Sequence, residues 1–73
     1  MQIHDVARNI ESGWKGKIRR IFDQDGIQMA EMVGIDTLVQ NTLFMTDDEC
    51  LDETDIQWHA IADLVPCKTV QAV

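Results

Sequence analysis

Residues 14–35 read WKGKIRRIFDQDGIQMAEMVGI, two segments of alternating character joined by a turn. The turn is Asp23-Gln24-Asp25-Gly26, because Asp-Gly favours the positive φ angles of a tight hairpin. After it, residues 27–35 alternate with period two, and one of their faces is apolar except at Glu31. That pattern is typical of a half-buried strand and not of a helix. The stretch therefore predicts a β-hairpin with strands over residues 14–22 and 27–35.

The first strand of this hairpin is rich in positive charge. Alternation places Lys15, Lys17 and Arg19 on one exposed face, with Arg20 on the other. Such a face can contact nucleic acid, discourage edge-to-edge aggregation, or pair with acidic side chains across the sheet. Gly16 in the same strand indicates a bulge or a close approach of another part of the backbone.

The remaining segments extend an all-β pattern around the hairpin. Residues 3–10 have apolar side chains at helical spacing but also suit a short strand near residues 6–8, which we favour. After it the pattern predicts a loop over 9–13, a strand that includes 43–45, a strand over 56–60, a 3₁₀ turn over 61–64 and a closing strand over 65–67. Pro66 confines the closing strand to a sheet edge, because proline has no N–H to donate to a neighbouring strand.

An acidic segment separates the strands predicted in the second half of the chain. Six carboxylates lie within residues 47–55, namely Asp47, Asp48, Glu49, Asp52, Glu53 and Asp55. Self-repulsion disfavours burial of such a run, so it predicts a surface loop. The loop can serve solubility alone. As an alternative, its carboxylates imitate the phosphates of a nucleic acid and occupy the basic groove of a partner.

Length and charge limit the class of protein. The 73 residues allow one domain, residues 1–73, whose small core favours further burial by oligomerisation. The net charge of −7 is divided into +3 on residues 1–20 and −10 on residues 21–73. Because binding to a duplex depends on neutralising phosphates, this balance argues against a nucleic-acid partner.

The sequence shows no targeting or membrane signal. The first residues lack the charged and apolar regions of a signal peptide, and no apolar run approaches the ~18 residues of a bilayer span. We therefore expect a cytoplasmic protein with no membrane partner. In that compartment Cys50 and Cys67 are expected to stay reduced and to pack as small apolar side chains.

The sequence predicts no catalytic residue, metal site or cofactor. His4, His59 and the two cysteines are the right types of ligand for zinc, but their spacing forms no Cys-x-x-Cys or His-x-x-x-His pair. No Ser-His-Asp, Cys-His or paired-carboxylate arrangement can be argued either. Trp14 and Trp58 could each be buried in the core or exposed on a binding groove. Trp14, beside the loop, is expected to be the more exposed of the two.

The order strand, turn, strand, loop, strand, 3₁₀ turn and strand resembles that of small Src-homology-3-like barrels. Two motifs carry the resemblance, Gly13-Trp14-Lys15-Gly16-Lys17-Ile18 and the late segment 56–66, IQWHAIADLVP. The resemblance implies a small five-stranded barrel, mostly antiparallel, with one 3₁₀ turn and an acidic loop. Its core is expected to form around Ile18, Met29, Val33 and Ile56.

A narrower resemblance concerns the plasmid-borne type II dihydrofolate reductases. Trp14-Lys15-Gly16 resembles their Trp-x-Gly start, and Ile56-Gln57-Trp58-His59 resembles their Val-Gln-Ile-Tyr strand. In that family four subunits form a pore that binds folate and NADPH. The resemblance implies that Gln57 matches the pore glutamine, while His59 stands where the family has tyrosine. The acidic stretch also lengthens the span between the two motifs.

These observations favour a small non-catalytic interaction module that binds a protein partner. The expectation includes assembly into a homo-oligomer. It also includes a gene carried on a phage or other mobile element. One alternative is an oligomeric enzyme similar to type II dihydrofolate reductase. Another is an acidic inhibitor that imitates nucleic acid. The candidate binding residues are Trp14, Lys15, Lys17, Asp47, Asp48, Glu49, Gln57, Trp58 and His59.

Overall fold

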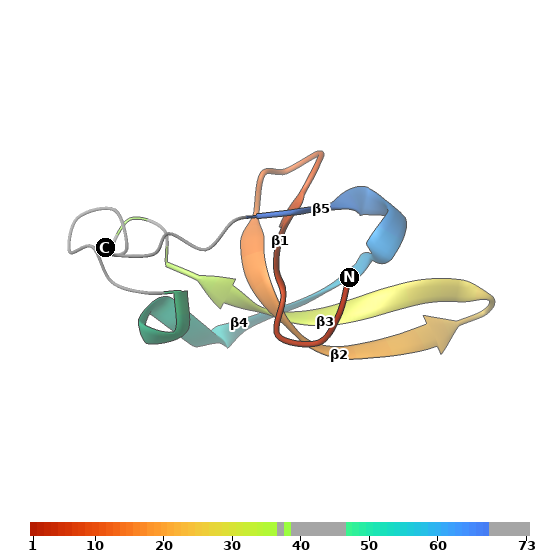
Figure 1. Cartoon of the computed structure of the whole chain (residues 1–73), viewed down its shortest axis with the longest axis horizontal. Coiled ribbons are helices and arrows are strands. Elements are labelled where there is room, and N and C mark those ends of the chain that lie inside the picture. Colours follow the sequence, from red (N-terminus) through yellow and green to blue (C-terminus); the bar gives the residue numbers. More distant parts are fainter. Residues whose placement is uncertain (37, 39–46, 68–73) are drawn as a thin grey trace.

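The hairpin predicted around Asp25-Gly26 is the centre of a five-stranded sheet. The computed structural model describes residues 1–36, 38 and 47–67, whose arrangement Figure 1 shows. The elements in chain order are β1 (Val6–Asn9), β2 (Lys15–Gln24), β3 (Ile27–Ile35), the 3₁₀ segment η1 (Asp47–Cys50), β4 (Leu51–Ala60), the 3₁₀ segment η2 (Ile61–Asp63) and β5 (Leu64–Pro66). All the described strand pairings are antiparallel. The all-β prediction is therefore confirmed.

The turn between β2 and β3 has the geometry that its sequence predicts. Gln24 pairs with Ile27, so the loop contains only Asp25 and Gly26. These two residues have φ angles of 53° and 83°, and a type I′ turn requires positive values at both positions. Glycine adopts such a φ without steric cost. β2 extends to Gln24, two residues beyond its predicted end.

The sheet is open, which corrects the prediction of a closed barrel. Its strand order is β4-β3-β2-β1-β5, so β4 and β5 lie at opposite edges. β5 has only three residues, and Pro66 among them has no N–H, so it cannot supply a second ladder toward β4. The chain crosses from β4 to β5 through η2. There the Ile10 N–H donates to the Asp63 carbonyl at 3.0 Å, which ties η2 to the loop after β1.

Apolar side chains collect on both faces of the sheet. On the face that we call the inner face, a buried cluster consists of Ala7, Ile18, Ala30, Met32 and Leu64. A second cluster, on the outer face, consists of Val6, Ile35 and Cys50, with Leu51 and Cys67 packed against it. Strand geometry explains the division, because successive side chains point to opposite faces. Neither cysteine is in a disulfide, and both pack among apolar side chains as expected.

The prediction of one core around four residues is wrong. Ile18 is fully buried on the inner face, whereas Val33 follows the inward-facing Met32 and points to the outer face. Met29 and Ile56 are only partly buried. A closed barrel has one interior, but an open sheet covered on both sides divides its apolar residues between two clusters.

The acidic segment belongs largely to a strand and not to a loop. β4 begins at Leu51 and lies at the edge of the sheet. Val33 pairs with Ile56 while Gly34 pairs with Asp52, so residues 53–55 form a bulge in β4. The predicted exposure is confirmed for residues 52–54. The predicted loop is wrong there, because an edge strand can turn charged side chains to solvent without burying them. The strand predicted at residues 43–45 lies outside the described residues.

A pair of glycines makes room for two polar side chains on the inner face. Gly16 and Gly34 are cross-strand partners in β2 and β3. A Cβ atom at Gly16 would lie 2.6 Å from the Trp14 ring, and one at Gly34 would lie 2.7 Å from a carboxylate oxygen of Asp55. The close backbone approach predicted at Gly16 is confirmed, because its Cβ would also lie 2.8 Å from the Val33 carbonyl oxygen. Within the described ranges, no helix has the length and apolar character needed to cross a bilayer.

Candidate functional site

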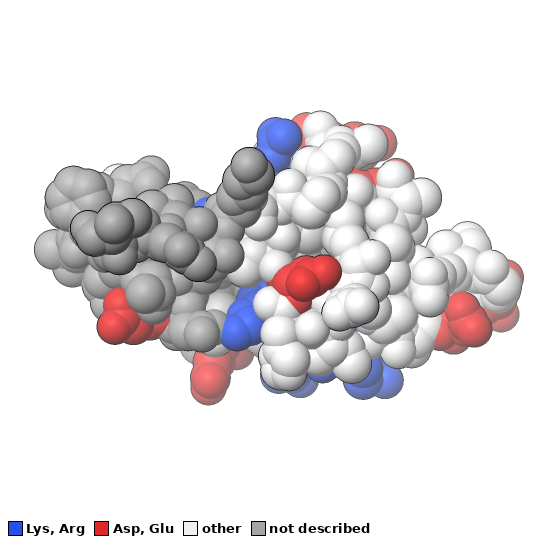
Figure 2. Space-filling view, in the orientation of Figure 1, with Lys and Arg blue, Asp and Glu red and all other residues white. Residues whose placement is uncertain are grey.

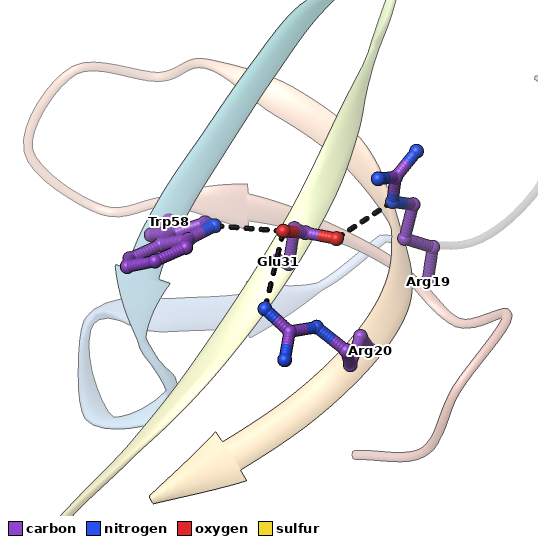
Figure 3. A network of polar contacts seen from close by, with 4 residues as sticks. All are labelled: Arg19, Arg20, Glu31 and Trp58. Carbon is purple, nitrogen blue, oxygen red and sulfur yellow. Dashed lines mark hydrogen bonds and ion pairs between the residues drawn. The ribbon is translucent and has the colours of Figure 1, made fainter. Parts of the chain in front are cut away.

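The outer face of β2, β3 and β4 carries a compact group of charged and aromatic side chains. Glu31 on β3 is the cross-strand partner of Arg20 on β2 and of Trp58 on β4. Figure 3 shows the Glu31 carboxylate between the indole of Trp58 on one side and the guanidinium groups of Arg19 and Arg20 on the other. Together with Phe22, we call these four residues the Trp58 face.

A bulge in β2 brings both arginines to one carboxylate. Ile18 pairs with Met32 and Arg20 pairs with Glu31, so Arg19 is an extra residue in β2. A bulge of this kind lets two successive residues oppose a single partner. Arg19 donates through Nε to Glu31 at 2.7 Å, and Arg20 donates through Nη2 at 3.3 Å. The predicted pairing of this strand across the sheet is confirmed, but the predicted placement of the two arginines on opposite faces is wrong.

The environment of Glu31 holds its carboxylate in the charged form. The side chain is only 12% exposed. The hydrogen bond from Arg19, followed by those from Trp58 and Arg20, lowers the pKa of Glu31 from 4.5 to about 2, although partial burial opposes the shift. At neutral pH one carboxylate therefore fixes the positions of three donor side chains.

We expect the destabilising effect of Glu31→Gln to disappear as the pH falls. Folding favours the charged form of Glu31, so its contribution to stability is fully present above a pH of about 4.5 and is lost as the pH falls through about 2. The urea midpoints of wild type and Glu31→Gln should differ most near neutral pH and converge in acid. Glu53→Gln, which changes an exposed carboxylate of the β4 bulge, is the matched control. A constant difference between wild type and Glu31→Gln across this range would contradict the expectation.

Trp58 is exposed although its polar atom is bonded. Its surface is 50% accessible, while Nε1 donates to Glu31 at 2.9 Å. The indole meets the Phe22 ring edge to face, with the centroids 4.9 Å apart. The guanidinium carbon of Arg20 lies 4.6 Å from the Phe22 centroid, within the range of a cation–π contact. The face thus presents an ordered indole to solvent.

The inner face brings together three predicted site residues, Trp14, Gln57 and His59. Asp55 accepts hydrogen bonds from Trp14 Nε1 at 2.9 Å and from Gln57 Nε2 at 3.3 Å. His59 lies 2.8 Å from Gln57 Oε1 through Nε2 and 2.9 Å from Asn9 Nδ2 through Nδ1. We call these five residues the inner network. Trp14 was predicted to be the more exposed tryptophan, and this is wrong, because it is half-buried against the inner cluster.

The hydrogen bonds of Asn9 determine which ring nitrogen of His59 accepts a hydrogen bond. Asn9 Oδ1 accepts from the backbone N–H groups of Glu11 and Ser12 at 2.9 and 3.0 Å, so its amide nitrogen is the group that faces His59. His59 Nδ1 must then accept a hydrogen bond, and Nε2 carries the proton that it donates to Gln57. Both ring nitrogens of His59 are engaged in this arrangement. The inner network therefore connects β1 to β4 across the open side of the sheet.

The other predicted site residues belong to neither group. Lys15 and Lys17 are half-buried on β2, and Asp47, Asp48 and Glu49 lie in η1. Figure 2 shows several basic side chains along the lower edge of the molecule, between acidic side chains at either end. The predicted set is thus divided among two faces of the sheet and η1, and it does not form a single site.

No relative is available to assign a role to either group. Compared with protein-family models, with curated proteins and with solved structures, the chain shows no match. In the part of the chain that the structure describes, no three His, Cys, Asp or Glu side chains come together in a way that could hold a metal ion. The function is therefore inferred from the geometry of the two groups.

Sequence reasoning missed Glu31 and Phe22 as members of the site. For Glu31 a signal was present, since it is the single charged residue on the otherwise apolar face of residues 27–35. Such a position is where a charge needs a partner. For Phe22 the sequence carries no such signal. The bulge at Arg19 shifts the side chains that follow it in β2 to the opposite face, and no glycine marks the bulge.

Proposed function

We propose that this chain is a non-catalytic interaction module that binds a protein partner through the Trp58 face. One observation carries the proposal. A half-exposed indole lies beside two exposed arginines that share one carboxylate. Tryptophan and arginine are among the residues most enriched where a few side chains dominate the energy of a protein interface.

The side chains of the Trp58 face are already held in fixed positions, which also favours binding. Immobilising a long side chain at an interface costs about 0.5–1.5 kcal/mol. Arg19, Arg20 and Trp58 are already held by Glu31, so much of this cost is met before a partner arrives. Two guanidinium groups against one carboxylate leave the face with a net positive charge, although the whole chain carries −7. This local charge favours an acidic partner.

The order of the elements, which resembles that of small Src-homology-3-like domains, also supports the proposal. η2 separates β4 from β5, and β5 returns to pair with β1. This follows the order of elements on which the resemblance rests, although the sheet here is open. Binding barrels of that class often expose aromatic side chains on a groove, as Trp58 is exposed here. The reductase-like and nucleic-acid-mimicking alternatives stay predictions, since no described contact favours either.

A peptide-display selection against the wild-type chain tests the proposal. Enriched peptides should carry acidic residues, and Trp58→Ala should weaken their binding at least about tenfold, as for a residue that dominates an interface. Ile10→Ala is the matched control, because Ile10 is an exposed apolar residue outside the Trp58 face. Fluorescence anisotropy measures the affinity for the selected peptides. An affinity that falls equally in both variants, or only in Ile10→Ala, would assign the partner to another surface.

A further inference from the structure

The second half of β4 forms a regular edge of the sheet. Residues 56–60 pair with residues 29–33 of β3 without a break in register. The bulge at residues 53–55 ends this regular stretch on one side, and η2 ends it on the other. Among the described residues, no strand lies beyond β4. Backbone groups that point away from β3 in this stretch therefore have no strand of the described chain beside them.

The hydrogen bonds of Ile18 show which backbone groups these are. Ile18 N–H donates to the Asp5 carbonyl at 2.8 Å, and the Ile18 carbonyl accepts from His4 N–H at 2.7 Å. Both backbone groups of Ile18 thus point away from β3. Antiparallel ladders alternate between hydrogen-bonded and non-hydrogen-bonded pairs. Met32 is the partner of Ile18, so it must exchange its own hydrogen bonds with Gln57 on β4.

The same alternation turns two residues of β4 toward the open edge. Gln57 and His59 direct their backbone groups to β3, so Ile56 and Trp58 direct theirs away from it. Each of these two residues offers one N–H and one C=O to a neighbouring strand. Trp58 is also the centre of the Trp58 face, so the open edge adjoins that face directly.

We infer that an extended segment of the partner adds to this edge as an antiparallel strand over residues 56–60. In this mode of recognition main-chain hydrogen bonds supply affinity, and the alternate side chains of the added strand supply specificity. Every second side chain of that strand lies on the outer face, where the indole of Trp58 is 50% exposed. A cross-strand pair with this ring favours an aromatic or β-branched residue. The inference rests on the proposed function and gives the partner its geometry.

Charge at the bulge favours a basic residue at one end of the added strand. Asp52 and Glu53 are exposed there, and an antiparallel strand reaches them with its C-terminal end, so lysine or arginine is favoured at that end. β4 holds three carboxylates and no lysine or arginine, so a second copy of β4 would not supply this charge. The arginines of the Trp58 face lie two strands away, on β2. The acidic group that they favour therefore belongs to another part of the partner.

Amide hydrogen exchange of the full chain tests the inference, with the peptide acetyl-Val-Thr-Val-Thr-Val-Lys-amide as the probe. In the free chain, the amides of Ile56 and Trp58 should exchange at least about tenfold faster than those of Gln57 and His59, whose N–H groups face β3. The peptide should bind with a Kd on the order of 0.1–1 mM. At ten times that Kd only about a tenth of the chain is free, so exchange at Ile56 and Trp58 should slow about tenfold.

Two N-methylated forms of the peptide are matched controls with identical side chains. In the antiparallel register the central valine opposes Trp58, so its N–H faces β4, whereas the N–H of the next threonine faces solvent. N-methylation of that valine should weaken binding at least about tenfold, and N-methylation of the threonine should change it less than about twofold. Replacing the lysine with glutamate should weaken binding about two- to fivefold.

The possible results separate this inference from the proposed function. Equal affinities of the two N-methylated peptides, slow exchange at Ile56 in the free chain, or no binding would overturn the inference. Protection of Ile56 that rises with protein concentration alone would assign the edge to a second copy and would also overturn it. Display peptides that need Trp58 but leave the Ile56 amide in fast exchange would support the Trp58 face and refute strand addition. Protection of Ile56 by the valine peptide, with display peptides indifferent to Trp58→Ala, would support strand addition and refute the Trp58 face.

Discussion

Gly16→Ala should destabilise the domain by about 3 kcal/mol, at the upper end of the cost of overpacking. The new Cβ would lie 2.6 and 2.7 Å from two atoms of the Trp14 ring and 2.8 Å from the Val33 carbonyl oxygen. The ring is held by its hydrogen bond to Asp55, and the carbonyl belongs to the strand paired with β2. Neither can retreat without breaking these contacts. The loss is large against a total stability of roughly 4–11 kcal/mol for a chain of this length.

Gly34→Ala is the matched control for Gly16→Ala. It changes the cross-strand partner of Gly16, but the three atoms nearest its Cβ belong to the Asp55 side chain, at 2.7, 3.1 and 3.1 Å. The carboxylate can rotate away at the cost of its hydrogen bonds to Trp14 and Gln57, and the Asp55 Cβ at 3.1 Å needs only a small shift, so the loss should be about 2 kcal/mol. Urea unfolding followed by circular dichroism measures both variants. A Gly16→Ala domain as stable as wild type, or no less stable than Gly34→Ala, would show that the Trp14 ring is not fixed against β2.

Ile18→Ala should cost about 3 kcal/mol, within the range of about 2–5 kcal/mol for removing a buried aliphatic side chain. Ile18 has no accessible surface and lies in the inner cluster between Ala7 and Met32. Alanine would leave a cavity that the neighbouring strands cannot close, because their hydrogen bonds fix their spacing. The same unfolding measurement applies. The variant should expose its apolar side chains, and so bind hydrophobic dyes, at a lower urea concentration than wild type.

Two further variants define the size of the Ile18 effect. Ile18→Val removes one methylene group and should cost about 0.5–1.5 kcal/mol. Ile27→Ala removes a side chain that is 56% exposed, so its effect should stay within about 0.5 kcal/mol. If Ile18→Ala were as mild as Ile27→Ala, the inner cluster would not be the main core of the domain.

The central hairpin could be predicted because its signals are local. The Asp25-Gly26 turn and the alternation on either side lie within about twenty residues of sequence, and each has one favoured geometry. Closure of the sheet could not be predicted in the same way. It depends on whether β4 meets β5, and that depends on the length of β5 and on the path of η2. Strand order alone does not distinguish an open sheet from a closed one.

The candidate site was only partly predictable for a related reason. The resemblance to the reductases singles out Gln57 and His59, and Trp58 stands between them as a candidate groove aromatic, yet alternation sends Trp58 to the outer face and the other two to the inner network. The bulge at Arg19 reverses the alternation in β2, and it brings Arg20 to Glu31. Such a bulge leaves no mark in a single sequence unless glycine occupies it.

The bulge in β4 also determines how the sheet meets copies of itself. β4 is an edge strand of ten residues, with no strand on its outer side within the described part of the chain. An edge of this length is a template on which a second molecule can add its own strand. Asp52 and Glu53 are exposed there, and their charges repel a copy that approaches edge to edge. Neutralising them would remove this repulsion and leave the β4 edge open to pairing with a second copy, whether or not these carboxylates ever touch a partner.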